Sequence, residues 1–195
     1  MRRVLVIDDH APSRDILRRA LAANRCEIVG EGSSGRAALE LASVTVPEVI
    51  LMAVGLPDLD GIHAARKIMQ AKPVPIILVS NHYDSETVER AKQVGVMGYL
   101  LKPLRDEEVL PAIELAVSHF REFVTLQKEN EDLKKTLEAR KIIERAKGIL
   151  MKSKGLSEAE AFSLIQKKSM DLRRPMGEIA QAVILSEELS KGKGA

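Results

Sequence analysis

The chain's 195 residues, 45% of them hydrophobic, are enough for one domain with a sizeable core and a smaller second unit. The single cysteine, Cys26, excludes an internal disulfide, and no apolar run approaches the roughly 20 residues that a membrane helix needs. We therefore expect a cytoplasmic protein with no membrane partner. The net charge of +2 hides an asymmetry, because residues 140–195 carry twelve basic and seven acidic side chains, whereas residues 1–118 carry fourteen and sixteen. This asymmetry places any polyanionic partner at the C-terminal end.

Residues 1–118 alternate short β-branched runs with amphipathic helical stretches. Apolar residues recur at helical spacing between the β-branched runs, which predict strands at residues 4–7, 27–30, 49–52, 75–79 and 98–101. Five βα units of this kind predict an α/β doubly wound, five-stranded parallel sheet with helices on both faces. The site of such a sheet lies at the carboxyl ends of its strands.

Polar side chains stand at several of these strand ends. Asp8 and Asp9 follow the first predicted strand, Ser80 follows the fourth and Lys102 the fifth. Carboxylates suit a hard divalent cation, an ammonium group neutralises phosphate charge, and a hydroxyl donates to a phosphate oxygen. Any one of these residues alone fits a solvated turn. Their expected convergence at one edge predicts a phosphoryl-binding pocket.

The stretches VLVIDDH, LMAVGLPDLDG, IILVS and GYLLKP resemble, in order and spacing, the receiver domain of bacterial two-component response regulators. The resemblance covers about residues 1–118 and implies a flavodoxin-like fold and a sensor histidine kinase, or another sensor protein, as partner. It also implies that Asp8 and Asp9 form an acidic metal-binding pair, with the Gly55 carbonyl as a further ligand. By the same resemblance, Ser80 is the switch hydroxyl, Tyr99 the switch aromatic and Lys102 the phosphate-contacting lysine.

Ala53 departs from the receiver pattern, because it stands where receivers carry the aspartate that accepts the phosphoryl group. A methyl group is neither a nucleophile nor a metal ligand, so phosphorylation at this position is excluded and Mg²⁺, the expected cofactor, should bind more weakly. Asp58 and Asp60 lie beyond the turn and are poor substitutes. Two explanations stay open: a naturally degenerate receiver with another input, or an engineered substitution that traps the unphosphorylated state.

Residues 119–139 contain no Gly or Pro, so one helix is expected to run from the receiver into the C-terminal module. The seam of a possible parallel two-stranded coiled coil lies in this linker, with Phe123, Asn130 and Leu137 at a positions and Leu126 and Leu133 at d positions. A lone Asn at an a position fixes register in such coils, which predicts a homodimer. The alternative is a single amphipathic helix packed on its own receiver.

Three helices are predicted in residues 140–190. The first ends near Gly155, the second begins at the capping box of Ser157 and Glu160, and the third begins after Pro175. In the second helix, Ala161, Phe162, Ile165 and Met170 are expected to point inward. The spacing of Lys141, Arg145 and Lys152 places them along one basic face, as phosphate neutralisation requires, although such faces are usually only solvated. The tail at 191–195 is expected to be disordered.

The elements AKGILM, GLSEAEAF and MDLRRPM resemble the ANTAR domain of bacterial transcription antitermination regulators. The resemblance implies a regulator whose dimer binds hairpins in nascent leader RNA and prevents transcription termination. An enzyme is not expected, because the predicted pocket has lost its nucleophile. With Lys141 from the basic face, the candidate RNA contacts are Arg145, Ala146, Lys147, Gly148, Arg173 and Arg174. Core packing explains Ala146 equally well. Two alternatives remain, a DNA-binding regulator and a protein-interaction module controlled by a sensor partner.

Overall fold

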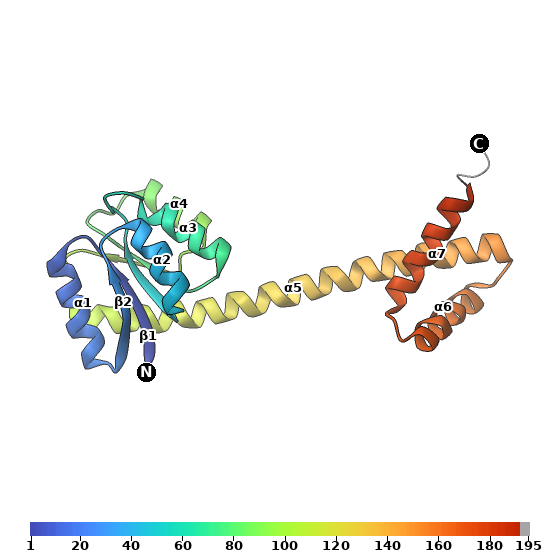
Figure 1. Ribbon diagram of the computed structural model, residues 1–195, viewed down its shortest axis with the longest axis horizontal. Coiled ribbons are helices and arrows are strands. Elements are labelled where there is room, and N and C mark those ends of the chain that lie inside the picture. Colours follow the sequence, from blue (N-terminus) through green and yellow to red (C-terminus); the bar gives the residue numbers. More distant parts are fainter. Residues whose placement is uncertain (192–195) are drawn as a thin grey trace. The chain divides into compact units, whose positions relative to one another are not determined.

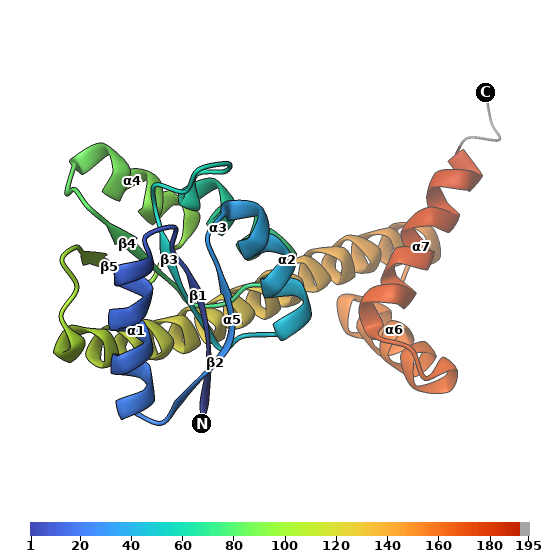
Figure 2. The ribbon, with the colours of Figure 1, turned by 60° about the vertical axis from the view of Figure 1, so that its left-hand side comes forward.

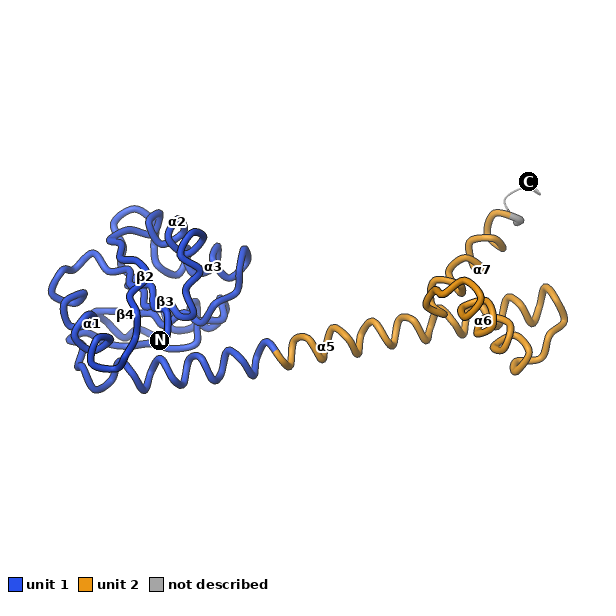
Figure 3. The backbone as a smooth tube through the Cα atoms, turned by 60° about the horizontal axis from the view of Figure 1, so that its bottom comes forward, with its two compact units in different colours: residues 1–124 blue, residues 125–195 orange. Residues whose placement is uncertain are grey.

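The computed structural model describes residues 1–191, with side chains through residue 189. The chain divides into two compact units, Met1–Val124 and Thr125–Ala195 (Figure 3). One helix, α5 (Asp106–Lys154), crosses the boundary between them, as the missing Gly and Pro in the linker predict. In the part of the chain that the structure describes, no helix has the length and apolar character to cross a membrane.

A sheet with helices packed around it forms the first unit (Figure 1). The sheet is five-stranded and all-parallel, in the order β2-β1-β3-β4-β5, which confirms the predicted α/β architecture. The strands are β1 (Arg2–Ile7), β2 (Cys26–Gly32), β3 (Val49–Ala53), β4 (Ile76–Ser80) and β5 (Gly98–Leu101). Each predicted strand is present, and the observed ends differ by at most two residues. The order reverses between β1 and β3, which creates a crevice at the carboxyl ends of these strands.

Helices cover both faces of the sheet (Figure 2). They are α1 (Ala11–Ala23), α2 (Gly35–Thr45), α3 (Gly61–Ala71), α4 (Ser85–Val94) and the first part of α5. Alternate residues of a strand face opposite sides, so Leu5 and Ile7 pack in the core beneath α2, α3 and α4, whereas Val4 and Val6 pack in the core beneath α1 and α5. Burial on both faces explains why the strands read as continuous apolar runs.

Side-chain caps fix where three of these helices begin. Ser34 accepts a hydrogen bond from the Ala37 N–H at the start of α2, and Asp84 accepts one from the Thr87 N–H at the start of α4. Asp60 does the same for α3 through the Ile62 N–H. These bonds satisfy backbone donors that have no partner within the helix.

In the second unit, α6 (Glu158–Leu172) and α7 (Met176–Lys191) pack on the end of α5. The predicted capping box is present, because Ser157 accepts from the Glu160 N–H and the Glu160 carboxylate accepts from the Ser157 N–H. The small core consists of Ala146, Leu150, Ala161, Ile165, Ala180 and Ile184.

Two inward positions predicted for α6 are wrong. Phe162 is 41% exposed and Met170 is 72% exposed, because the core of this unit accepts only the stripe that contains Ala161 and Ile165. Of the predicted tail, Lys191 is the last residue of α7, and residues 192–195 lie outside the described part of the chain.

Candidate switch pocket and basic surface

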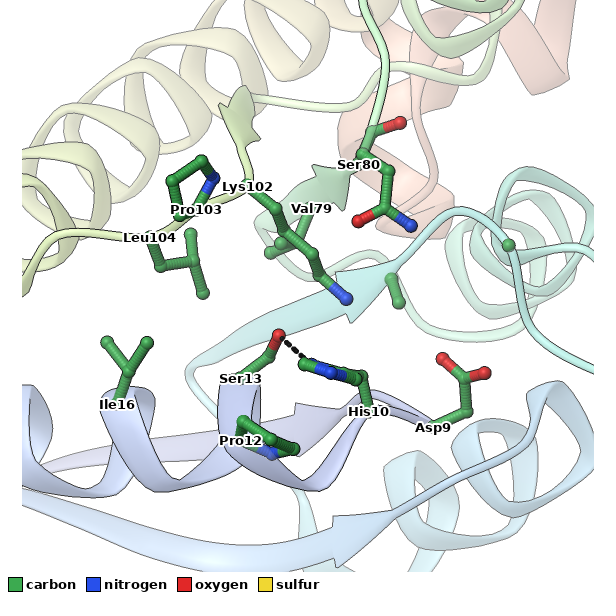
Figure 4. A pocket seen from close by; sticks show the side chains of 13 residues that line it. Asp9, His10, Pro12, Ser13, Ile16, Val79, Ser80, Lys102, Pro103 and Leu104 are labelled. Carbon is green, nitrogen blue, oxygen red and sulfur yellow. Dashed lines mark hydrogen bonds between the residues drawn. The ribbon is translucent and has the colours of Figure 1, made fainter.

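A pocket of about 550 Å³ lies at the carboxyl ends of the strands (Figure 4). Its lining includes the predicted positions Asp9, Ala53, Gly55, Ser80 and Lys102. The structure therefore brings together residues that lie up to 93 positions apart, at the edge where a parallel sheet places its site.

Lys102 forms an ion pair with Asp8, the other acid of the predicted metal-binding pair. Its Nζ atom lies 2.9 Å from Oδ1 and 2.8 Å from Oδ2 of Asp8, whose side chain is 1% exposed. The backbone N–H of His10 also donates to Asp8 Oδ1, at 2.9 Å. The buried carboxylate is thus neutralised by a lysine of the same pocket.

The two predicted switch residues share one acceptor. Ser80 Oγ donates to the carbonyl oxygen of His82 at 2.9 Å, and the Tyr99 hydroxyl donates to the same oxygen at 3.1 Å. The His82 N–H donates back to Ser80 Oγ at 3.2 Å. Through this carbonyl, the end of β4 and the centre of β5 are joined to the loop that precedes α4.

The donor set for a metal ion is incomplete. Asp9 is exposed at the pocket and Gly55 lies on its rim, but Asp8 is held by Lys102 and Ala53 offers no oxygen. Among the described residues, no group of three or more His, Cys, Asp or Glu side chains could hold a metal ion. Mg²⁺ demands near-octahedral oxygen ligands, so these residues fit it poorly.

Neither Asp58 nor Asp60 replaces the missing carboxylate, as expected. Asp58 accepts the N–H groups of Gly35, Arg36 and Leu59. Although desolvation works to raise the pKa of Asp58, these backbone hydrogen bonds lower it on balance, so the group is held as an anion. Asp60 caps α3 and forms an ion pair with Arg90 at 2.6 Å.

Sequence reasoning missed three polar residues of the pocket, His10, Ser13 and Asn81. Figure 4 shows the hydrogen bond between His10 and Ser13, whose Nδ1 and Oγ atoms lie 2.9 Å apart. His10 directly follows the acidic pair, and this position after a strand end is the signal that could have found it.

On the second unit, Arg145, Gly148 and Lys152 line a hollow of about 350 Å³. A Cβ atom added at Gly148 would have no neighbour within 4 Å, so the backbone of α5 is open to an approaching molecule there. Arg145 also forms an ion pair with Glu188 of α7, at 2.8 Å. Glu187 also lines this hollow, which joins Arg145 and Gly148, two of the predicted RNA contacts.

Two other predicted contacts, Ala146 and Lys147, are buried. Ala146 is 0% exposed in the core, and the Lys147 side chain is 8% exposed. Lys147 Nζ donates to Glu158 at 2.7 Å and to Glu144 at 2.9 and 3.0 Å. The hydrogen bond to Glu158, followed by that to Glu144, raises the pKa of Lys147, and the same lysine lowers the pKa of Glu158. In this conformation neither side chain offers a surface to a ligand.

The remaining candidates are exposed. Lys141 pairs with Glu138 on the same helix at 2.8 Å, and Arg174 pairs with Glu178 at 3.4 Å. Arg173 ends α6 in the left-handed conformation, with φ 50°. Surface pairs of this kind stabilise little, so these cations can exchange their partners for phosphate.

The fold and the site define a regulator with a receiver-type sheet and a small helical output module. The chain belongs to the response regulator family: residues 4–114 match the response regulator receiver domain, and residues 131–184 match the ANTAR domain. This result confirms the resemblance inferred from the sequence for both parts of the chain.

Individual relatives agree with this architecture. The transcriptional regulatory protein PdtaR of Mycobacterium tuberculosis is 42% identical over 183 residues, which cover 94% of this chain and 89% of PdtaR. The solved receiver domain of NarL from the same species is 34% identical, with a TM-score of 0.57, and covers 60% of this chain and 95% of that domain. A protein-glutamate methylesterase of Methanospirillum hungatei is 36% identical over 124 residues, but the match covers only 35% of that enzyme.

Proposed function

We propose that this response regulator binds hairpins in nascent leader RNA and prevents transcription termination, as the ANTAR resemblance implies. The proposed organisation is a receiver at 1–118, a coiled-coil linker at 119–139 and an RNA-binding module at 140–190, acting in the cytoplasm. A sensor histidine kinase or another sensor protein is the proposed upstream partner.

The open hollow at Gly148, which two cations and one acid line, is the observation that carries this proposal. Arg145 and Lys152 flank a helical position that has no side chain, with free space above it. Glycine inside a helix costs roughly 0.5–1 kcal/mol relative to alanine, so a packing role would have to offset that cost. Since nothing packs on Gly148, close approach of a polyanion gives a reason for its presence.

The test uses Gly148→Leu, measured by fluorescence anisotropy with a two-hairpin RNA across a salt series. The substitution should preserve or slightly raise thermal stability, because leucine is a better helix former and its Cβ atom would meet no neighbour within 4 Å. RNA affinity should nevertheless fall by about tenfold or more, equivalent to roughly 1.4 kcal/mol. Arg173→Ala with Arg174→Ala should weaken binding and reduce the salt slope.

One control and two contradicting outcomes complete the test. The matched control is Lys128→Ala, which removes an exposed cation of the linker outside the ANTAR match and should leave affinity unchanged. Equal RNA affinity of the Gly148→Leu variant and the unaltered chain would show that the hollow at Gly148 does not bind RNA. Preference for duplex DNA over hairpin RNA in competition would favour the DNA-binding alternative instead.

For the receiver, we propose that phosphorylation at position 53 does not occur. Ala53, the last residue of β3, is 3% exposed and has no nucleophilic atom. Mg²⁺ binding should be weaker than in receivers with a carboxylate there, and no step of the proposed mechanism depends on the metal. Any other input must favour one receiver state by its differential affinity.

We also propose that the linker pairs with a second copy of the chain. The predicted seam residues Phe123, Leu126, Leu133 and Leu137 are 40%, 58%, 70% and 54% exposed. These exposed apolar side chains at a and d spacing support the coiled-coil proposal. Exposed apolar stripes with heptad spacing are stable when a partner helix covers them.

A further inference from the structure

A second cavity, of about 410 Å³, lies at the opposite end of the receiver from the switch pocket, between the last turns of α2 and α3. These two helices lie side by side on one face of the sheet (Figure 2). The cavity lies at the edge where the strands begin, because its lining includes Pro47 and Val74, which precede β3 and β4. A volume of this size falls within the range of sites for small ligands, roughly 300–1,000 Å³.

The walls of this cavity are aliphatic, formed mainly by Leu39, Ala42, Val46, Ile68, Ala71 and Val74. Lys67 and Lys72 are its charged lining residues, and the lining contains no acid. Across residues 1–189, neither lysine has an ion pair or a side-chain hydrogen bond, and both are exposed. An apolar interior with two uncommitted cations at its edge matches a ligand with an apolar body and one anionic group.

These lysines could instead serve the negative ends of the two helix dipoles. Other groups already donate hydrogen bonds to carbonyls at the end of α2. Ser43 Oγ donates to Glu40 and Thr45 Oγ1 to Leu41. The Arg3 guanidinium donates to the Thr45 carbonyl. At the end of α3, the Lys72 backbone N–H donates to the Ile68 carbonyl. Neither lysine ammonium contributes to these bonds, which leaves both available to a ligand.

Val46 supplies a second, independent observation at the cavity. It adopts the left-handed conformation, with φ 47° and ψ 63°, which is strained for a β-branched residue. Two hydrogen bonds between Glu48 and Arg3 of β1 fix the chain next to Val46. The Arg3 N–H donates to the Glu48 carboxylate, and the Glu48 N–H donates to the Arg3 carbonyl, both at 2.8 Å. Val46 is the C-cap of α2, and its left-handed conformation both ends that helix and places Val46 in the cavity wall.

We propose that this cavity binds a small amphiphilic carboxylate, with its apolar chain between α2 and α3 and its carboxylate at Lys67 and Lys72. The site is separate from the pocket at Ala53. Such a ligand would offer an input to a receiver whose phosphoacceptor position carries alanine.

The test uses the full chain with octanoate and with octanol as its uncharged match, followed by backbone NMR titration. Octanoate should saturably shift the amides of residues 39–46 and 67–74, Pro73 excepted, and bind about tenfold more tightly than octanol. Ala42→Leu, which fills the cavity with an aliphatic side chain, should weaken octanoate by at least about tenfold while leaving the rest of the spectrum unchanged.

Lys67→Gln with Lys72→Gln should reduce octanoate binding to the level of octanol. Lys128→Gln with Lys134→Gln changes the charge of the chain equally, on exposed linker positions, and should have no effect. Shifts outside the two segments, unchanged affinity in Ala42→Leu, or equal affinities for octanoate and octanol in the unaltered chain would each overturn the proposal.

Discussion

The carboxylate of Asp8 and the ammonium of Lys102 form a buried ion pair, with Nζ 2.8 Å from Oδ2 and the two side chains 1% and 12% exposed. The residues stand 94 positions apart, at the ends of β1 and β5. Ala53 ends β3, which lies between β1 and β5 in the strand order. Lys102 is the cation that neutralises the buried Asp8. The charge of the buried Asp8 is therefore balanced within the protein.

Removing the lysine should destabilise the receiver. Lys102→Met leaves Asp8 buried without its cation, and breaking a buried pair costs about 3–5 kcal/mol. Urea unfolding can be followed by tyrosine fluorescence, because the chain has no Trp and its two tyrosines, Tyr83 and Tyr99, lie in the first unit. Lys92→Met, on an exposed lysine of α4, should change the free energy by less than about 0.5 kcal/mol. Equal midpoints for the two variants would refute a structural role of the pair.

Restoring the carboxylate should restore phosphorylation. In Ala53→Asp, a carboxylate oxygen can attack the phosphorus of acetyl phosphate and displace acetate, which forms an acyl phosphate. With Mg²⁺ present, intact-mass measurement should show one phosphoryl adduct on the variant and none on the unaltered chain. Ala53→Asn, of similar size without a nucleophilic carboxylate, is the control. An adduct on the unaltered chain would reveal a different acceptor.

The linker seam predicts concentration-dependent dimerisation. Leu126→Lys with Leu133→Lys places two charges in the proposed seam and should shift sedimentation equilibrium toward the monomer. The control, Val124→Lys with Glu131→Gln, changes the net charge by the same amount at b positions outside the seam. If both variants associate as strongly as the unaltered chain, the coil is not the dimer interface. If the unaltered chain is monomeric at high concentration, no coil forms.

Lys147 should act as a structural ion-pair partner within the RNA module. The hydrogen bond from Lys147 lowers the pKa of Glu158, so the stabilisation is present above the usual glutamate pKa and is lost as pH falls through the lowered value. Carboxyl NMR titration should show the pKa of Glu158 returning toward its ordinary range in Lys147→Met. Glu160 is the internal control, because Ser157 lowers its pKa and that shift should persist. A Glu158 pKa that does not change would contradict the pairing.

Much of the receiver could be predicted because hydrophobic period and strand-end chemistry are local signals. Continuous apolar runs gave the five strands, and parallel order then placed Asp9, Ser80 and Lys102 at one edge. The end of α5 and the start of α6 were also predictable, because Gly155 and the Ser157 capping box act within a few residues.

Contacts between distant segments required the tertiary structure. The ANTAR resemblance made Lys147 a candidate RNA contact, but Lys147 pairs with Glu144 and Glu158 because α6 folds back on α5. Phe162 fits an apolar helical stripe, yet the core is too small to cover it. The sequence alone therefore specified the elements and the residues at their ends, because periodicity and capping are short-range. Packing of those elements decided which charges are paired and which apolar groups are buried, because burial depends on neighbours far along the chain.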